Sequence, residues 1–387
     1  MKLENLTPHA ALLLKNGSIR DDRMMGCVIV RVLFDVDAAG ALSPSKDRWP
    51  LGVEPVETPL GRMPGDKPFY LGGVDVLLGG RVFQPEGLPE GRLEVEVEVG
   101  RTFRKRFLVI GDRKWLRTEA GELVPTAPAP FLSMALRYGL AFGGQAKNET
   151  GQPVPYSPNP DGRGYYLDEA SAVGQPLPNL EQPGALVARF DDRPVPVGLG
   201  YYPETGSLRP IAAINHPAAS GARSQIFGKG PVVPGPPVTP PAPLDSEITA
   251  DHLTPALFNQ AHPDMVIEAR KSPLPGDAVR LSRGRRGGED LAFVLPETPA
   301  HVHVQLADRE ALVPLHLDQI GILGGEDRVL LSYRTVFEYR VVAREKRFAT
   351  LHPGPLPAEI PARYRKHAPP EWDGGFGEAG FSDAKVE

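Results

Sequence analysis

Glycine and proline set the strongest limit on how this chain can fold. The 387 residues include 42 Gly and 44 Pro, nearly twice the usual combined share of about 12%. Proline removes a backbone donor and glycine loses backbone entropy when it is ordered, so both interrupt helices. Short strands joined by many turns tolerate them better. We therefore expect a mainly β protein: two antiparallel, sandwich-like β-sheet domains, bridged by an ordered loop region rich in glycine and proline, with few short helices.

The clearest strand pattern lies at residues 92–99. Four apolar residues alternate there with Glu94, Glu96 and Glu98, a period of two that predicts a half-buried strand. Residues 102–110 follow as the returning strand of a hairpin. Further strands are predicted at 26–36, 74–83, 277–282, 290–295, 301–306, 312–317, 328–333 and 335–342.

These elements suggest a division of the chain into segments. Residues 228–244 contain seven prolines, which favours an extended polyproline II conformation of about 3.1 Å per residue. One short helix is expected around 250–261. The predicted organisation is an N-terminal β domain at 1–125, a loop-rich motif region packed on it at 126–227, a proline-rich linker or belt at 228–245, a C-terminal β domain at 246–352 and a flexible tail at 353–387.

Charge and cysteine usage exclude several classes of function. A net charge of −5 gives no electrostatic footprint for nucleic acid or an anionic membrane, so we expect neither as a partner. The single cysteine, Cys27, excludes an internal disulfide framework and is predicted to be a small buried hydrophobe in a strand. The N-terminus has no stretch typical of a signal peptide, and no segment has the length of a membrane span. A cytoplasmic location is expected.

Few residues form patterns typical of a metal, cofactor or nucleophile site. His301 and His303 share a strand face that His316 could join, and three histidines can bind zinc. The alternating valines, however, predict that these histidines face outward as surface residues. Arg283–Gly288 is a single basic cluster, better explained as a hairpin loop than as an RNA-binding segment. No phosphate-binding loop or nucleophile elbow is present, so no cofactor, metal or catalytic residue is predicted.

The segment 131–181 is the part that composition does not explain. It contains arginines, asparagines, tyrosines and carboxylates but no histidine or cysteine. Arg137 and Arg163 could hold Asp161 or Glu181 in forked ion pairs that lock the loops. An enzyme would have to draw its acid and base from Asp161, Asp168, Glu169 and Glu181, which lack a catalytic spacing. An ordered binding surface or a structural loop cluster explains the segment better.

Three motifs in this segment resemble a family of bacterial adaptor-chaperones for type VI secretion effectors. They are Leu136–Gly144, Asn159–Gly164 and Leu177–Glu181, and weaker likenesses extend the resemblance over most of 1–345. Gly139 departs from the family, which more often has glutamate there. The residues predicted to bind a partner or lock the loops are Arg137, Tyr138, Phe142, Gly143, Gly144, Asn159, Pro160, Gly162, Arg163, Gly164, Pro178, Asn179 and Glu181.

The resemblance implies a function of holding and delivering a cargo protein. Such an adaptor binds a toxin effector in the cytoplasm and helps to load it onto the spike protein of the secretion machine. The implied partners are therefore that effector and that spike protein, and an all-β adaptor could bind through its sheet edges. Two alternatives stay open: an enzyme that uses the carboxylates and arginines of 131–181, and a structural component that remains with the assembled spike.

Overall fold

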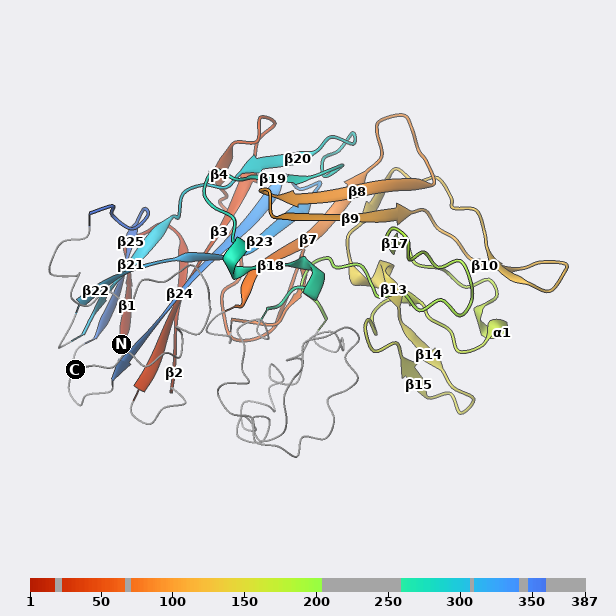
Figure 1. Cartoon of the computed structure of the whole chain (residues 1–387), viewed down its shortest axis with the longest axis horizontal. Helices are drawn as coiled ribbons and strands as arrows, with labels where there is room; N and C mark the ends of the chain where they lie inside the picture. The colour runs from red at the N-terminus through yellow and green to blue at the C-terminus, as the bar shows by residue number, and fades with distance from the viewer. Residues whose placement is uncertain (18–22, 67–70, 204–258, 307–309, 341–346, 360–387) are drawn as a thin grey trace.

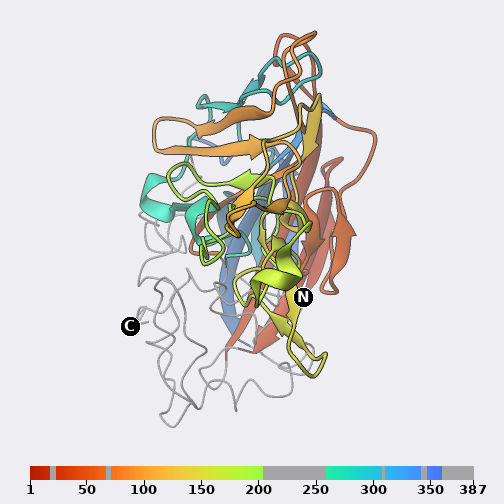
Figure 2. The same ribbon diagram turned by 90° about the vertical axis from the view of Figure 1, so that its right-hand side faces the viewer.

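The chain is mainly β, as the sequence predicts. The computed structural model describes residues 1–17, 23–66, 71–203, 259–306, 310–340 and 347–359. Figure 1 shows three larger sheets at one end and in the middle of the molecule, with a group of loops and short strands at the other end. Figure 2, seen from that second end, places the loops and the helix α1 toward the viewer.

The largest sheet has eight strands and runs through the centre of the molecule. Its order is β12-β7-β23-β24-β3-β2, with β18 also pairing β7 and β4 also pairing β3. Cys27 to Val30 in β3 are fully buried, as expected for a strand covered on both faces. The strands are β2 (Ala10–Gly17), β3 (Arg23–Val36), β4 (Leu42–Pro44), β7 (Gly73–Phe83), β12 (Ser133–Ala135), β18 (Val266–Glu268), β23 (His316–Gly324) and β24 (Arg328–Arg340).

Two further sheets lie beside it. The five-stranded sheet β17-β9-β8-β19-β20 consists of β8 (Arg92–Val99), β9 (Phe103–Ile110), β17 (Leu180–Glu181), β19 (Ala278–Leu281) and β20 (Leu291–Val294). The four-stranded sheet β1-β25-β21-β22 consists of β1 (Lys2–Asn5), β21 (Ala300–Gln305), β22 (Glu310–Pro314) and β25 (Phe348–Pro353).

The remaining described elements are short. Four two-stranded pairs are β5 (Val56–Thr58) with β6 (Gly61–Met63), β10 (Trp115–Arg117) with β11 (Leu123–Pro125), β13 (Phe142–Gly143) with β16 (Arg163–Gly164), and β14 (Gln145–Lys147) with β15 (Pro153–Pro155). The described helical elements are α1 (Glu169–Ala172) and the single 3-10 turns η1 (Tyr138–Leu140), η5 (Pro263–Met265) and η6 (Ala269–Lys271).

The sheets combine the two ends of the chain, which differs from the expected division into separate β domains. Strand β3 pairs with β24 over thirteen residue positions, from Asp35↔Arg328 to Arg23↔Arg340. Strand β8 pairs with β19, and β1 pairs with β25. Because each of the three larger sheets contains strands from both 1–125 and the C-terminal part of the chain, neither segment has a larger sheet of its own.

Most of the predicted strands are present, and the differences concern the C-terminal part. The pattern at 328–333 and 335–342 belongs to one long strand, β24. The strand expected at 312–317 divides, because β22 ends at Pro314 and β23 begins at His316. The proline-rich stretch 228–244, most of the expected helix at 250–261 and the last part of the tail lie outside the described residues.

One large apolar core joins the three sheets, and a smaller one lies under the loops. Val95, Val97 and Val99 of β8 are fully buried against the central sheet. The second cluster contains Trp115, Leu123, Phe142, Ala172, Leu177 and Val187. No helix in the described part of the chain is long and apolar enough to cross a membrane.

Candidate functional site: the motif loops and an arginine-lined depression

Asn159 joins the first two motifs from a fully buried position. Its side-chain amide donates to the backbone carbonyls of Tyr138 and Phe142, at 3.0 Å each. The backbone carbonyl of Asn159 accepts from the backbone N–H groups of Gly144 and Gly162, at 2.8 and 3.2 Å. The asparagine of an Asn-Pro turn has a short polar side chain that can bond nearby backbone groups. The asparagine therefore fixes one loop against the other.

The motif glycines are required by close contact between these loops. Gly143 has a φ of +146°, and a Cβ atom there would lie 2.1 Å from the Asn159 carbonyl oxygen. At Gly162 a Cβ atom would lie 2.4 Å from the Asn159 side-chain nitrogen. Neither position can hold a residue larger than glycine, because the backbones of β13 and β16 meet here as a parallel pair.

The third motif connects the loops to the end of β9. The Asn179 side chain donates to the carbonyl of Ile110 at 2.8 Å and to Oδ1 of Asp112 at 3.1 Å. Its backbone N–H donates to the carbonyl of Leu140 at 2.8 Å. Asn179 thus links the motif that begins at Leu136 to the five-stranded sheet.

The ion pair that holds Glu181 differs from the predicted one. Arg113, not Arg137 or Arg163, donates to Glu181, and both partners are almost completely buried. The Glu181 carboxylate also accepts from the backbone N–H of Val187 at 2.9 Å. Burial raises the pKa of Glu181, and the positive charge of Arg113 opposes that rise. The sequence gives no signal for Arg113, because it lies 68 positions before its partner.

The aromatic motif residues, Tyr138 and Phe142, are buried under the loops and pack against them. The Tyr138 hydroxyl is buried, which raises its pKa, and it accepts from the backbone N–H of Leu199 at 3.0 Å. Phe142 is 1% exposed and meets the Tyr156 ring edge to face at 5.0 Å. Pro178 lies against Gly164 and its carbonyl accepts from Arg113, while Pro160 is half-buried beside Asn159. Most motif residues are thus engaged within the loops themselves.

Two of the predicted arginines instead line an open depression of about 330 Å³. The side chain of Arg137 is exposed and forms no hydrogen bond or ion pair with another described residue. Arg163 donates from Nε to the Gly139 carbonyl at 3.2 Å, and its Nη1 lies 3.9 Å from Oδ1 of Asp112. Arg81 of β7 also lines the depression. Three arginines and one carboxylate therefore line the depression, which gives it a surplus of positive charge.

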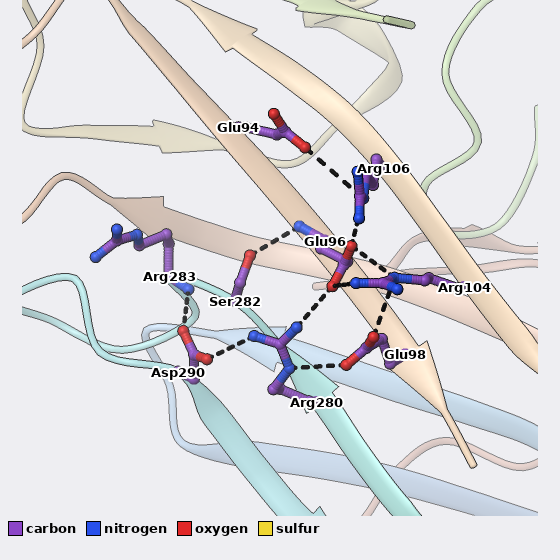
Figure 3. Close-up of polar contacts among 9 residues, drawn as sticks. All are labelled: Glu94, Glu96, Glu98, Arg104, Arg106, Arg280, Ser282, Arg283 and Asp290. Atoms are coloured by element: carbon purple, nitrogen blue, oxygen red, sulfur yellow. Dashed lines mark hydrogen bonds and ion pairs between the residues drawn. The ribbon is translucent and has the colours of Figure 1, made fainter. Parts of the chain in front are cut away.

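A second polar constellation covers the outer face of the five-stranded sheet (Figure 3). Glu96, which is 8% exposed, accepts from Arg104 at 2.7 and 2.9 Å and from Arg280 at 2.6 Å, and Arg106 also donates to it. Hydrogen bonding from Arg104, assisted by Arg106 and opposed by burial, lowers the pKa of Glu96 to about 2. The drawn side chains comprise four carboxylates and four arginines. This face balances its own charge, unlike the depression.

Most of the carboxylates that an enzyme would use already have a structural partner. Asp168 caps α1 by accepting from the backbone N–H of Ser171 at 2.7 Å, and Glu169 pairs with Arg117 at 3.1 Å. Asp161 is exposed in its turn. Glu181 is buried with Arg113, so three of the four carboxylates have a structural partner of their own.

The histidines and the basic cluster also have local partners. His301 is 8% exposed and stacks on His352 at 5.5 Å, so the expectation that it faces outward is wrong. His303 lies 3.3 Å from a Glu310 oxygen. In the described ranges no three or more His, Cys, Asp or Glu side chains are placed to hold a metal ion. Arg285 is 9% exposed and donates to backbone carbonyls after β3.

Comparison with known proteins gives one match that covers most of the chain. The sequence profile of a family described as "Uncharacterized protein conserved in bacteria (DUF2169)" matches residues 21–334. The chain belongs to the DUF2169 family. The DUF2169 match includes all three motifs, Arg113 and the strands β3 to β23. No curated protein and no solved structure matches the chain.

Proposed function

We propose that this DUF2169 protein is a non-catalytic adaptor that binds a toxin effector of a type VI secretion machine. It would hold the effector in the cytoplasm and help to load it onto the spike protein. The proposal starts from the likeness of the three motifs to effector adaptor-chaperones. Membership of a bacterial family agrees with it but names no activity.

The observation that carries the proposal is how the motif residues are used. Asn159, Asn179 and Glu181 are buried and bond to backbone in neighbouring loops. Their bonds fix the loops against one another, because each side chain links two segments of backbone, although Oδ1 of Asn159 and of Asn179 has no partner among the described residues. Arg137 and Arg163 remain at the surface of that scaffold. A rigid scaffold with an exposed charged depression suits recognition of another protein.

The enzyme alternative has less support. It requires Asp161, Asp168, Glu169 and Glu181 to share a reaction centre. Three of these four carboxylates already cap, pair or lie buried within the loops. A general acid or base needs a carboxylate that is available to the substrate, and these structural roles reduce that availability.

Co-purification of the tagged full-length protein with the product of each adjacent gene tests the adaptor proposal. We expect a stable complex in size-exclusion chromatography with light scattering, lost when the N-terminal region of the effector is deleted. The adaptor should also dissociate from the spike protein once the effector has been transferred to the spike. A protein that elutes alone with every neighbour would contradict the proposal, and one that stays bound to the assembled spike would favour the structural component.

A further inference from the structure

The depression beside Arg137 lies against a sheet edge. Among the described residues, strand β12 pairs only with β7, and the isolated bridge between Glu90 and Phe131 ends just before it. Ser133, Met134 and Ala135 of β12 line the depression together with Leu140, Arg163 and Asn179 of the motif loops. The edge of the eight-stranded sheet and the motif loops therefore meet at one place.

The hydrogen-bond pattern of β12 shows which backbone groups face the depression. Gln84 N–H donates to the Leu132 carbonyl, and Leu136 N–H donates to the Gly80 carbonyl. In an antiparallel pair the bonded positions alternate with positions whose N–H and C=O point away from the partner. The register Ser133↔Phe83 and Ala135↔Arg81 therefore turns the backbone groups of Ser133 and Ala135 away from β7.

Those outward groups are only partly occupied. The Ser133 carbonyl accepts from Nη2 of Arg81 at 3.3 Å, and the Ser133 hydroxyl accepts from Nε and Nη2 of Arg81. The N–H groups of Ser133 and Ala135 have no acceptor among the described residues. Two donors on a strand edge can bond an added strand.

The charge of the depression selects the kind of strand. Arg81, Arg137 and Arg163 line the depression with a single carboxylate, Asp112, whose side chain is 79% exposed. Of the three, Arg137 forms no side-chain bond to a described residue, and Arg163 has only the distant Asp112 at its Nη1. Guanidinium groups bind carboxylates through paired N–H donors, and these charge-assisted bonds are stronger than neutral ones. Leu132, next to β12, is 67% exposed and offers an apolar contact.

We propose that the depression binds a short extended segment of the partner polypeptide that carries a carboxylate. The segment adds to β12 through the N–H groups of Ser133 and Ala135. Its carboxylate is that of an acidic side chain and lies between Arg137 and Arg163. This inference rests on the proposed function as a protein-binding adaptor and names the chemistry of the bound segment.

The test is fluorescence polarisation with the full-length protein and three labelled peptides. The first is Thr-Val-Glu-Val-Glu-Thr with an amidated C-terminus, the second its glutamine analogue, and the third that analogue with a free C-terminal carboxylate. We expect the first peptide to bind and the second to bind at least about tenfold more weakly, as expected for loss of a charge-assisted bond. Binding of the third peptide would assign the carboxylate to a chain terminus.

Substitutions show whether peptide binding depends on the contact with Arg137 or only on the overall positive charge of the protein. Arg137→Gln should weaken binding of the glutamate peptide about tenfold without changing the fold, because its side chain is exposed. Arg189→Gln is the matched control, since Arg189 is exposed elsewhere. Ala135→Pro removes an N–H that does not bond β7 and should abolish added protection of the Ser133 amide in hydrogen exchange. Equal affinity of Arg137→Gln and the unaltered protein, or of the glutamate and glutamine peptides, would overturn the inference.

The two proposals fail in different ways. If the effector still co-purifies with Arg137→Gln at unchanged affinity, the adaptor function stands and the depression is not its docking site. If the acidic peptide binds as expected but no neighbouring protein co-purifies, the depression binds carboxylates and the adaptor function fails.

Discussion

At the residue scale, a single arginine neutralises the buried carboxylate at the end of the motif loops. Glu181→Ala would leave Arg113, 5% exposed, buried without its partner. Breaking a buried ion pair from one side costs about 3–5 kcal/mol. We expect a loss of that size in the free energy of unfolding, measured by urea denaturation followed by circular dichroism.

The matched control for this substitution is Glu149→Ala. Glu149 is exposed in the β14–β15 turn, where surface changes usually stay within about 0.5 kcal/mol. A loss below about 1 kcal/mol in Glu181→Ala would show that the Arg113 pair does not hold the loops.

The lowered pKa of Glu96 predicts a pH dependence of folding stability that can be assigned to one face of the protein. Its pKa is about 2 in the folded chain, against an ordinary value of 4.5. The unfolded chain therefore binds more protons between these values, so the stability from Glu96 is complete above about pH 4.5 and is lost as the pH falls toward about 2. Urea midpoints of the unaltered protein and Glu96→Gln should converge over that interval. A constant difference between them down to about pH 2 would contradict the assignment.

The raised pKa of the buried Asp75 predicts the opposite dependence of folding stability on pH. Burial raises its pKa from 3.8 to about 6, although Gln260 and Asn259 donate to it. The folded chain then binds more protons than the unfolded chain between about pH 3.8 and about pH 6, so stability falls as the pH rises through that window. Asp75→Asn should remove this decline in urea midpoints. The decline would persist in the variant if another group caused it.

At the scale of elements, β13 and β16 form only two paired positions, so their geometry depends on glycine. Gly143→Ala would place a methyl group 2.1 Å from the Asn159 carbonyl. We expect a loss of at least about 2 kcal/mol in the free energy of unfolding and faster protease cleavage within 136–164. Gly52→Ala is the control, because a Cβ atom there meets nothing within 4 Å. Equal cleavage rates for the two variants would contradict the tight contact.

Local pattern was sufficient for some elements and not for others. The alternation of Leu93 to Val99 with glutamates correctly predicts β8 and its hydrophobic face. Only the first two residues of β23 fall in a predicted strand, because Asp318, Gln319 and Gly321 interrupt its apolar run, although all of β23 from Asp318 onward is buried. Its polar residues bond to distant segments, as Gln319 does with Gln260 at 3.2 Å. Such contacts depend on residues far away in the sequence.

The same limit applies to the candidate site. The asparagine turns and the motif glycines are visible in the sequence because turn chemistry is local. The partner of Glu181 and the meeting of β12 with the motif loops are not, because both require the chain to return from a distance. Sequence spacing therefore indicated which residues matter but not which residues they contact.

At the scale of the whole molecule, the sharing of sheets predicts that neither half folds alone. Without β24, strand β3 would expose its apolar residues on an unpaired edge, and β8 would lack β19. A fragment of residues 1–125 should therefore be unfolded or aggregated, with poor amide dispersion in NMR spectra. Co-expression with residues 126–387 should restore a folded complex. A dispersed spectrum from the fragment alone would show an independent N-terminal domain.

The pairing of β1 with β25 has a consequence for synthesis. Lys2 lies opposite Phe348, so the first strand emerges from the ribosome long before its neighbour exists. At about 5–20 residues per second, that interval is roughly 20–70 s. Strand β3, whose residues Cys27 to Val30 are fully buried in the folded chain, waits almost as long for β24, so the yield in the cell should depend on translation speed and on the factors that shield emerging polypeptides.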